Sequence, residues 1–202
     1  MNPALKDKVT PEEYLAIERE ADFRSEFLDG EMFAMAGGTA NHNVVIGNLR
    51  AELRNRFKGR PCLTYSENLR VQIPATGLYS YPDLVALCGP PSFLDLVRDT
   101  LLNPQLVVEV LSSKTEAFDR GLKFAHYRSI PSLLEYVLVS QREPLVERFT
   151  RQANGSWNLV VFSGFDATVN FESVDAAVPL AEIYENVEFG PEPGAEGAAT
   201  PV

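Results

Sequence analysis

The spacing of apolar residues divides the chain into helical and extended segments. From Asn41 to about Phe57, apolar residues recur every three or four positions, which predicts a helix with one buried face. A second helical pattern runs from Ser113 to Arg128. Two near-continuous apolar runs are typical of central strands buried on both faces, and shorter runs predict further strands. The strands expected from these patterns are 69–73, 83–87, 106–111, 134–139, 145–150 and 157–162.

Turn and capping residues refine the N-terminal part of this pattern. Thr10-Pro11-Glu12-Glu13 has the spacing of a capping box with proline at the first helical position, so a helix is expected from there to about Glu20. Asp29-Gly30 lies between two apolar-containing runs and predicts a two-residue hairpin, because a type I′ turn requires positive φ at both positions.

These elements together predict one α/β domain over residues 8–189. The predicted N-terminal helix and hairpin precede the other elements of this domain. Residues 190–202 are rich in Gly, Pro and Ala and contain no large apolar residue except the last, so we expect a disordered tail.

Composition narrows the functional class. The chain has 202 residues, 45% of them hydrophobic, and lacks both a membrane-length apolar run and a signal-peptide core, so we expect a cytoplasmic protein without membrane partners. Its two cysteines, Cys62 and Cys88, are expected to be small core residues rather than a redox pair. The formal net charge of −10 argues against coating of nucleic acid through bulk charge, although a local basic patch stays possible.

Two carboxylates interrupt the apolar runs. Asp83 stands at the start of the first run and Glu109 inside the second. A carboxylate in a buried strand is unfavourable unless it is paired, hydrogen-bonded or bound to a metal. Either residue alone would be explained by hydrogen bonds near a strand end, whereas the pair favours a shared site.

Three further positions could complete such a site. Lys123 follows Asp119 by four residues and precedes Tyr127 by four, so the three side chains share a helical face, as they also would in an ordinary solvated ion pair. Glu26 precedes the predicted hairpin turn, and His42 begins the long predicted helix.

The ordered set of these residues resembles the Uma-type "putative restriction endonuclease" family, a branch of the PD-(D/E)XK nuclease superfamily. The resemblance rests on Pro82-Asp83, on Glu109-Val110-Leu111-Ser112 and on Asp119-x-x-x-Lys123-x-x-x-Tyr127. Segments 25–31, 41–42 and 178–184 match in the same order, so nearly the whole chain except the tail is covered.

The resemblance implies a restriction-endonuclease-like fold, in which a mixed central β-sheet is flanked by helices. It also implies a metal-dependent endonuclease acting on nucleic acid, with DNA as the expected substrate. Asp83 and Glu109 would bind Mg²⁺ or Mn²⁺ beside the backbone carbonyl of Val110, and Glu26 would add a ligand or orient a water. Leu111 occupies the usual lysine position of the superfamily, so that role passes to Lys123, with Lys114 as a weaker substitute. Tyr127 and His42 would support the site. Hard oxygen ligands suit either cation.

The sequence also indicates where a nucleic acid could bind and which other functions are compatible with the same residues. Arg50, Arg54 and Arg56 form a candidate phosphate-contacting patch, which Arg70 or Arg120 could extend, although arginines on an amphipathic helix commonly only solvate its outer face. A homodimer is expected by analogy. The alternatives are an inactive nuclease fold serving as a binding or assembly module, and a hydrolase using the Asp83–Glu109 pair on another substrate such as a glycoside.

Overall fold

The structure is a computed structural model that describes residues 8–35 and 37–190. The helices are α1 (Pro11–Glu20), α2 (Ala40–Arg56), α3 (Glu116–Phe118), the π-helical turn η1 (Asp119–Lys123), α4 (Phe124–Tyr127), the 3-10 turn η2 (Glu172–Val174) and α5 (Leu180–Ile183). The strands are β1 (Ser25–Leu28), β2 (Glu31–Ala34), β3 (Cys62–Ser66), β4 (Arg70–Ile73), β5 (Leu78–Ser80), β6 (Leu84–Cys88), β7 (Thr100–Leu101), β8 (Leu106–Leu111), β9 (Glu135–Ser140), β10 (Leu145–Arg151), β11 (Trp157–Ser163), β12 (Thr168–Phe171) and β13 (Ala176–Pro179). The predicted tail lies outside the described residues from position 191 onward.

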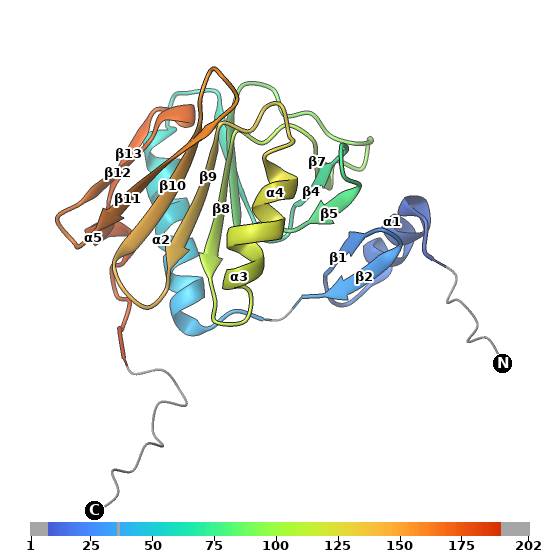
Figure 1. Cartoon of the computed structure of the whole chain (residues 1–202), viewed down its shortest axis with the longest axis horizontal. Coiled ribbons are helices and arrows are strands. Elements are labelled where there is room, and N and C mark those ends of the chain that lie inside the picture. Colours follow the sequence, from blue (N-terminus) through green and yellow to red (C-terminus); the bar gives the residue numbers. More distant parts are fainter. Residues whose placement is uncertain (1–7, 36, 191–202) are drawn as a thin grey trace, which may run out of the picture.

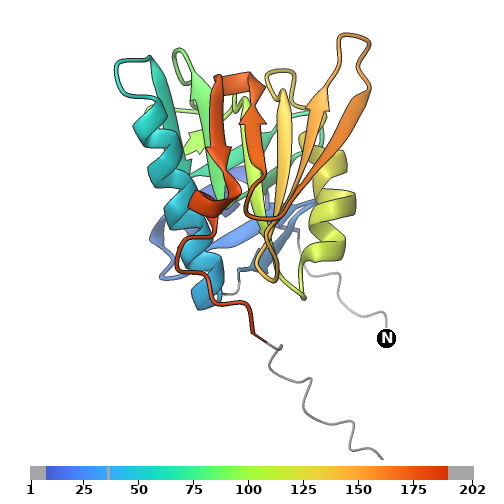
Figure 2. The same cartoon turned by 90° about the vertical axis from the view of Figure 1, so that its left-hand side faces the viewer.

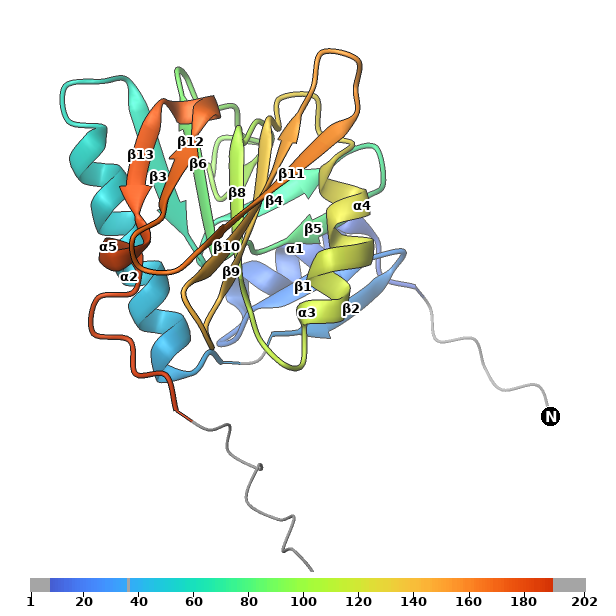
Figure 3. The same cartoon turned by 60° about the vertical axis from the view of Figure 1, so that its left-hand side comes forward.

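A mixed six-stranded sheet in the order β11-β10-β9-β8-β6-β3 forms the centre of the fold (Figure 1). Only β8 and β9 run parallel, and the other neighbours are antiparallel. Helix α2 covers one face of this sheet and the α3–η1–α4 segment lies on the other side (Figures 2 and 3). The mixed sheet flanked by helices therefore agrees with the fold class expected from the sequence.

Two separate cores explain the near-continuous apolar strands. Along β8, Val108 and Val110 pack with α2, α5 and the β12–β13 hairpin, whereas Val107 and Leu111 face the second sheet and α4. Because successive strand side chains point to opposite faces, a strand covered on both sides must be apolar at every position. Glu109 has the same parity as Val107 and therefore lies on the face toward the second sheet.

The second sheet carries the N-terminal hairpin. Its strand order is β2-β1-β5-β4-β7, and β1 pairs with β2 across the turn at Asp29 and Gly30. Both turn residues have positive φ, 51° and 84°, which confirms the two-residue hairpin. The capping box of α1 is also present, with Thr10 Oγ1 accepting from the Glu13 backbone N–H at 3.2 Å.

The second helical segment differs from its prediction. Instead of one regular helix from residue 113 to 128, the ordered turns begin at Glu116 and include the π-helical stretch from Asp119 to Lys123. Such wider turns occur mostly as single insertions within helices, and often at functional sites. Here the π-helical stretch begins at Asp119 and ends at Lys123, and both of these ionisable side chains are buried.

The cysteine prediction is right about the core and wrong about pairing: Cys62 is buried in the core and Cys88 packs against it. Cys62 and Cys88 stand directly opposite each other in the antiparallel β3–β6 pair and form a disulfide. The sequence offered no signal, because the pairing depends on the register between two strands rather than on a short cysteine spacing. Among the described residues, no helix is long and apolar enough to cross a membrane.

Candidate active site

Strand register brings the two predicted carboxylates to one place. In the antiparallel β6–β8 pair, Leu84 lies opposite Val108, so the next step along both strands sets Asp83 beside Glu109. The backbone N–H of Val110 donates to Asp83 Oδ2 at 2.6 Å. Both acids line the same pocket, as the sequence pattern and the resemblance required.

Lys123 provides a buried positive charge between the acids. Its ammonium nitrogen lies 2.9 Å from Glu109 Oε1 and 3.5 Å from both Glu26 Oε1 and Asp119 Oδ1. Only 6% of Lys123 is exposed, so its pairing with Asp119 is not the solvated surface pair that the sequence also allowed. Burial alone would lower the pKa of Lys123, but the carboxylates of Glu109 and Glu26 outweigh that effect and raise it well above its ordinary value.

Glu26 reaches the site from β1 and is held by two consecutive residues at the end of β5. Ser80 Oγ donates to Glu26 Oε1, and the Tyr81 backbone N–H does so at 3.4 Å. Tyr127 Oη in turn donates to Ser80 Oγ at 3.1 Å, which places Tyr127 in a supporting position behind the acid. This chain of contacts connects the N-terminal hairpin with the helix that carries Lys123.

His42 contacts the other end of the acid pair. It lies in the first turn of α2, where Thr39 Oγ1 accepts from its backbone N–H at 3.2 Å. Its Nε2 is 3.2 Å from Asp83 Oδ2. Burial by itself would lower the pKa of His42, but the hydrogen bond to Asp83 and the charge of that carboxylate raise it.

Two contributing residues were missed as site residues by the sequence analysis. Asp119 is buried against Lys123, and its position four residues earlier on the same helical face was the available signal. Ser80 stands only three residues before Asp83, and nothing in its sequence context marked it as a partner of Glu26.

Negative charge exceeds positive charge in the pocket. Four carboxylates and two lysines line a cavity of about 380 Å³; the carboxylates are Glu26, Asp83, Glu109 and Asp119. Burial raises the pKa of Glu109 well above its usual range, and the charges of Asp83 and Asp119 raise it further against the opposing effect of Lys123. Burial likewise raises the pKa of Asp119. The site would therefore gain from an additional cation.

The donor set fits a hard divalent cation held by two carboxylates. Among the described residues, no hydrogen bond or ion pair involves Asp83 Oδ1 or Glu109 Oε2, while their other oxygens contact Val110, His42 and Lys123. Within those same ranges, no group of three or more His, Cys, Asp and Glu side chains is arranged to hold a metal. Mg²⁺ is commonly held by one or two carboxylates and several waters, so two acids suffice.

The predicted arginine patch does not reach this pocket. Arg50 and Arg54 are exposed on α2, and by helical rise Arg54 is roughly 18 Å along the axis from His42. Arg56 is engaged by Glu52 and Glu182. None of the three lines the cavity as the structure describes it.

Arg70 and Arg120, which could have extended the patch, form ion pairs within the protein. Arg70 is buried and paired with Asp99, and Arg120 pairs with Glu116 and Glu147. Arg70 is buried because β4 is covered on both sides, so its side chain points into a buried network.

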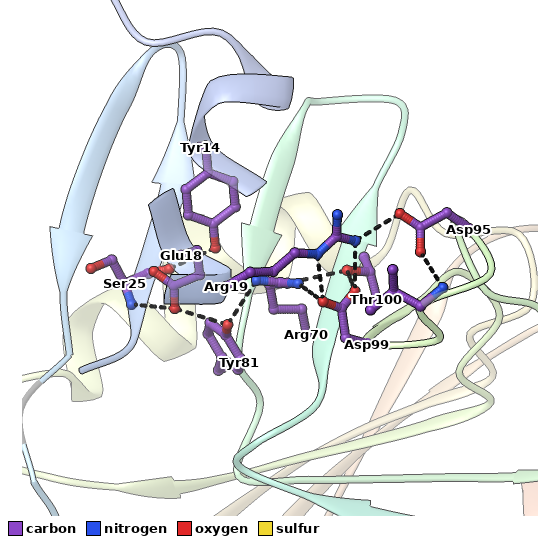
Figure 4. A network of polar contacts seen from close by, with 10 residues as sticks. Tyr14, Glu18, Arg19, Ser25, Arg70, Tyr81, Asp95, Asp99 and Thr100 are labelled. Carbon is purple, nitrogen blue, oxygen red and sulfur yellow. Dashed lines mark hydrogen bonds and ion pairs between the residues drawn. The ribbon is translucent and has the colours of Figure 1, made fainter. Parts of the chain in front are cut away.

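That network lies next to the pocket and joins α1 to the second sheet (Figure 4). Glu18 Oε1 accepts from Tyr81 Oη at 2.9 Å and from the Ser25 backbone N–H at 3.0 Å. Arg70 contacts Tyr81 Oη at 3.3 Å and pairs with Asp99, which also pairs with Arg19 at 2.9 Å. We call this set the hairpin network: Glu18, Arg19, Ser25, Arg70, Tyr81 and Asp99.

The fold and the convergent acids define an α/β protein of the restriction-endonuclease-like class. A solved structure of similar fold is the crystal structure of a putative nuclease belonging to DUF820 from Anabaena variabilis, with a TM-score of 0.70 and 17% identity over 87% of this chain and 97% of that chain. This likeness bears on the fold alone.

Sequence comparison gives the family. Residues 11–180 match the Uma2 family, described as "Putative restriction endonuclease". Two uncharacterized proteins of Synechocystis sp. are similar: sll1609, 35% identical over 81% of this chain and 92% of its own length, and slr1290, 33% identical over 90% of this chain and 94% of its own length. The chain therefore belongs to the Uma2 family.

Proposed function

We propose that this protein is a metal-dependent nuclease that hydrolyses phosphodiester bonds of nucleic acid. The observation that carries the proposal is the juxtaposition of Asp83 and Glu109 with the Lys123 ammonium in one pocket with an excess of acids. Family membership supports the same chemistry. Mg²⁺ or Mn²⁺ is the proposed cofactor, held by Asp83 and Glu109 near the backbone of Val110.

Each protein group has a distinct task in this proposal. The cation, when bound, would polarise the scissile phosphate and lower the pKa of a water. Without metal, the carboxylates of Glu109 and Glu26 raise the pKa of Lys123, so we assign Lys123 the task of placing positive charge beside the phosphate oxygens. Glu26 orients the ammonium, Tyr127 supports Glu26 through Ser80, and His42 holds Asp83 in place.

The position of Lys123 bears on the inactive-module alternative. That alternative arose because Leu111 stands where the superfamily usually has lysine. Leu111 packs into the core, and Lys123 brings an ammonium to 2.9 Å from the same strand's Glu109. A lysine from the helix can thus serve a carboxylate on β8, which favours the enzyme over the module.

Two measurements test the proposal. Thermal unfolding with chelator, Mg²⁺ and Mn²⁺ should show a rise in melting temperature with metal, since a ligand of the native state stabilises it by mass action. Cleavage of single-stranded and duplex DNA and of RNA should require the same metals. A metal-induced shift without cleavage would favour the module, and the absence of both would refute metal-dependent nuclease chemistry.

Assembly and cellular location stay predictions. The homodimer is proposed because a small acidic chain has little surface to hold a nucleic acid, and light scattering of the purified protein would test it. Fractionation of cells that express the protein would test the expected cytoplasmic location.

A further inference from the structure

Phe33 stands directly opposite a proposed active-site acid. In the antiparallel β1–β2 hairpin, Phe33 is the register partner of Glu26. Side chains of directly opposed residues lie on the same face, with Cβ atoms about 4.5–5.5 Å apart. The phenyl group therefore faces the same cavity as the Glu26 carboxylate, and both residues line it.

The ring of Phe33 is available for a contact from outside the chain. It is 50% exposed and, in the part of the chain that the structure describes, belongs to no aromatic pair. A single exposed apolar residue is ordinary on a protein surface. The setting is what distinguishes Phe33, because Met35 and Phe118 add apolar surface to the cavity that also holds the acids.

The pocket thus combines two kinds of surface within one volume. One part carries the carboxylates and Lys123, which suit a cation and a phosphate; another part carries Phe33, Met35 and Phe118. A nucleotide has the same two parts, an anionic phosphate and a flat aromatic base joined by one sugar. Stacking on aromatic side chains is how proteins commonly bind bases of single strands without reading sequence.

We propose that Phe33 stacks on the base of an unpaired nucleotide adjacent to the scissile phosphate. This inference rests on the proposed nuclease function and specifies its substrate as single-stranded nucleic acid, or a strand opened at the cleavage position. A base inside a duplex is covered on both faces by its neighbours, so it must leave the stack before a protein ring can cover it.

Binding of oligonucleotides by Phe33 variants tests this contact. Phe33→Ala should weaken binding of a short single-stranded DNA by about 5- to 100-fold, the range for removal of one stacked base contact. Phe33→Trp should bind within about threefold of the native protein. Phe23→Ala is the matched control, because Phe23 is 62% exposed yet lies outside the cavity, and it should bind as the native protein does.

An abasic nucleotide scanned through the oligonucleotide supplies the decisive comparison. At the stacked position it should weaken binding by the native protein about as much as Phe33→Ala does, and it should cost the Phe33→Ala variant no further affinity. To prevent cleavage, all binding is measured in a Glu109→Gln background, so that "native" refers there to position 33 alone. Initial cleavage rates with Mn²⁺ are measured with Glu109 intact.

The outcomes separate this inference from the proposed function. Equal binding and cleavage by native and Phe33→Ala proteins would refute stacking while leaving the nuclease intact. If Phe33→Ala lowers the affinity for abasic and normal oligonucleotides equally, Phe33 has a structural role and does not contact the base. If the native protein prefers intact duplex to single-stranded oligonucleotides, the single-stranded substrate is refuted. If the native protein neither binds nor cleaves any oligonucleotide, the nuclease proposal itself fails.

Discussion

Two polar clusters meet at Tyr81, and they differ in how their charges are balanced. In the hairpin network, Asp99 has two arginine partners, and although burial opposes the shift, the hydrogen bonds from Arg19 and Arg70 hold the pKa of Asp99 well below its usual range. In the candidate active site, four carboxylates share one buried ammonium and one exposed lysine. There, burial and neighbouring acids raise the pKa of Glu109 instead.

The difference is the one expected between a cluster that stabilises the fold and one that binds a cation, as proposed for the pocket. Opposite charges with good hydrogen bonds hold α1 against the second sheet in the hairpin network. Uncompensated acids in the pocket raise the free energy of the metal-free fold, and a bound cation would relieve that repulsion. Burial of ionisable groups is common to both clusters, so the opposite pKa shifts of Asp99 and Glu109 distinguish them better than burial does.

Removal of the Lys123 charge should have the largest effect. Lys123→Met leaves Glu26, Glu109 and Asp119 without their buried partner, so we expect a loss of about 3–5 kcal/mol in the free energy of unfolding without metal. Cleavage should fall by at least about 100-fold. Chemical denaturation with chelator and initial-rate assays measure the two effects. Lys114→Met, which removes an exposed pocket lysine, is the matched control; a larger loss of cleavage there would transfer the role to Lys114.

Neutralising one acid in each cluster should change stability in opposite directions. Asp99→Asn removes a charge paired with two arginines and should lower the free energy of unfolding by about 1–3 kcal/mol. Glu109→Gln relieves the repulsion by Asp83 and Asp119. It also removes the closest partner of Lys123, but Glu26 and Asp119 stay 3.5 Å from that ammonium, so metal-free stability should be unchanged or higher by about 1 kcal/mol, while any stabilisation by Mn²⁺ is abolished. Parallel urea titrations with and without Mn²⁺ compare them. Destabilisation by both substitutions to the same extent would remove the distinction between the clusters.

The pH dependence of metal-free stability should separate the same two acids. Asp99 has a lowered native pKa, so its contribution is full above its unfolded value near 4 and is lost as pH falls through the native pKa. Glu109 has a raised native pKa, so its contribution is full below about 4.5 and is lost as pH rises through the native pKa. Differences between native and variant proteins, measured by denaturation from pH 2 to 8 with chelator, should therefore slope in opposite directions: the contribution of Asp99 rises with pH up to about 4, and that of Glu109 falls with pH above about 4.5.

The exposed arginines of α2 should give the smallest effect. If Arg50 and Arg54 contact phosphates outside the pocket, replacing both with Ala should lower the slope of log affinity against log salt by about one to two. Arg56→Ala is the contrasting variant, because Arg56 is engaged by Glu52 and Glu182 and should affect stability rather than the slope. An unchanged slope in the double variant would assign Arg50 and Arg54 to solvation of the helix.

Much of the local structure could be predicted from the amino-acid sequence. The capping box at Thr10, the turn at Asp29-Gly30 and the central strands all depend on short-range rules, and each is present. The acids and Lys123 were also named beforehand, with the resemblance assigning their roles. The two missed contributors, Ser80 and Asp119, gain their importance only from contacts with Glu26 and Lys123 across the fold.

Apolar periodicity and turn chemistry along the chain were enough to establish the class of fold, because helices and strands are selected by interactions between residues close in sequence. The assembled fold was needed to show that Cys62 pairs with Cys88, that Arg70 is buried, and that Phe33 faces the acids. Each of these depends on strand register or on which face is covered. Those features arise from contacts between distant segments, and a linear pattern of residues does not specify them.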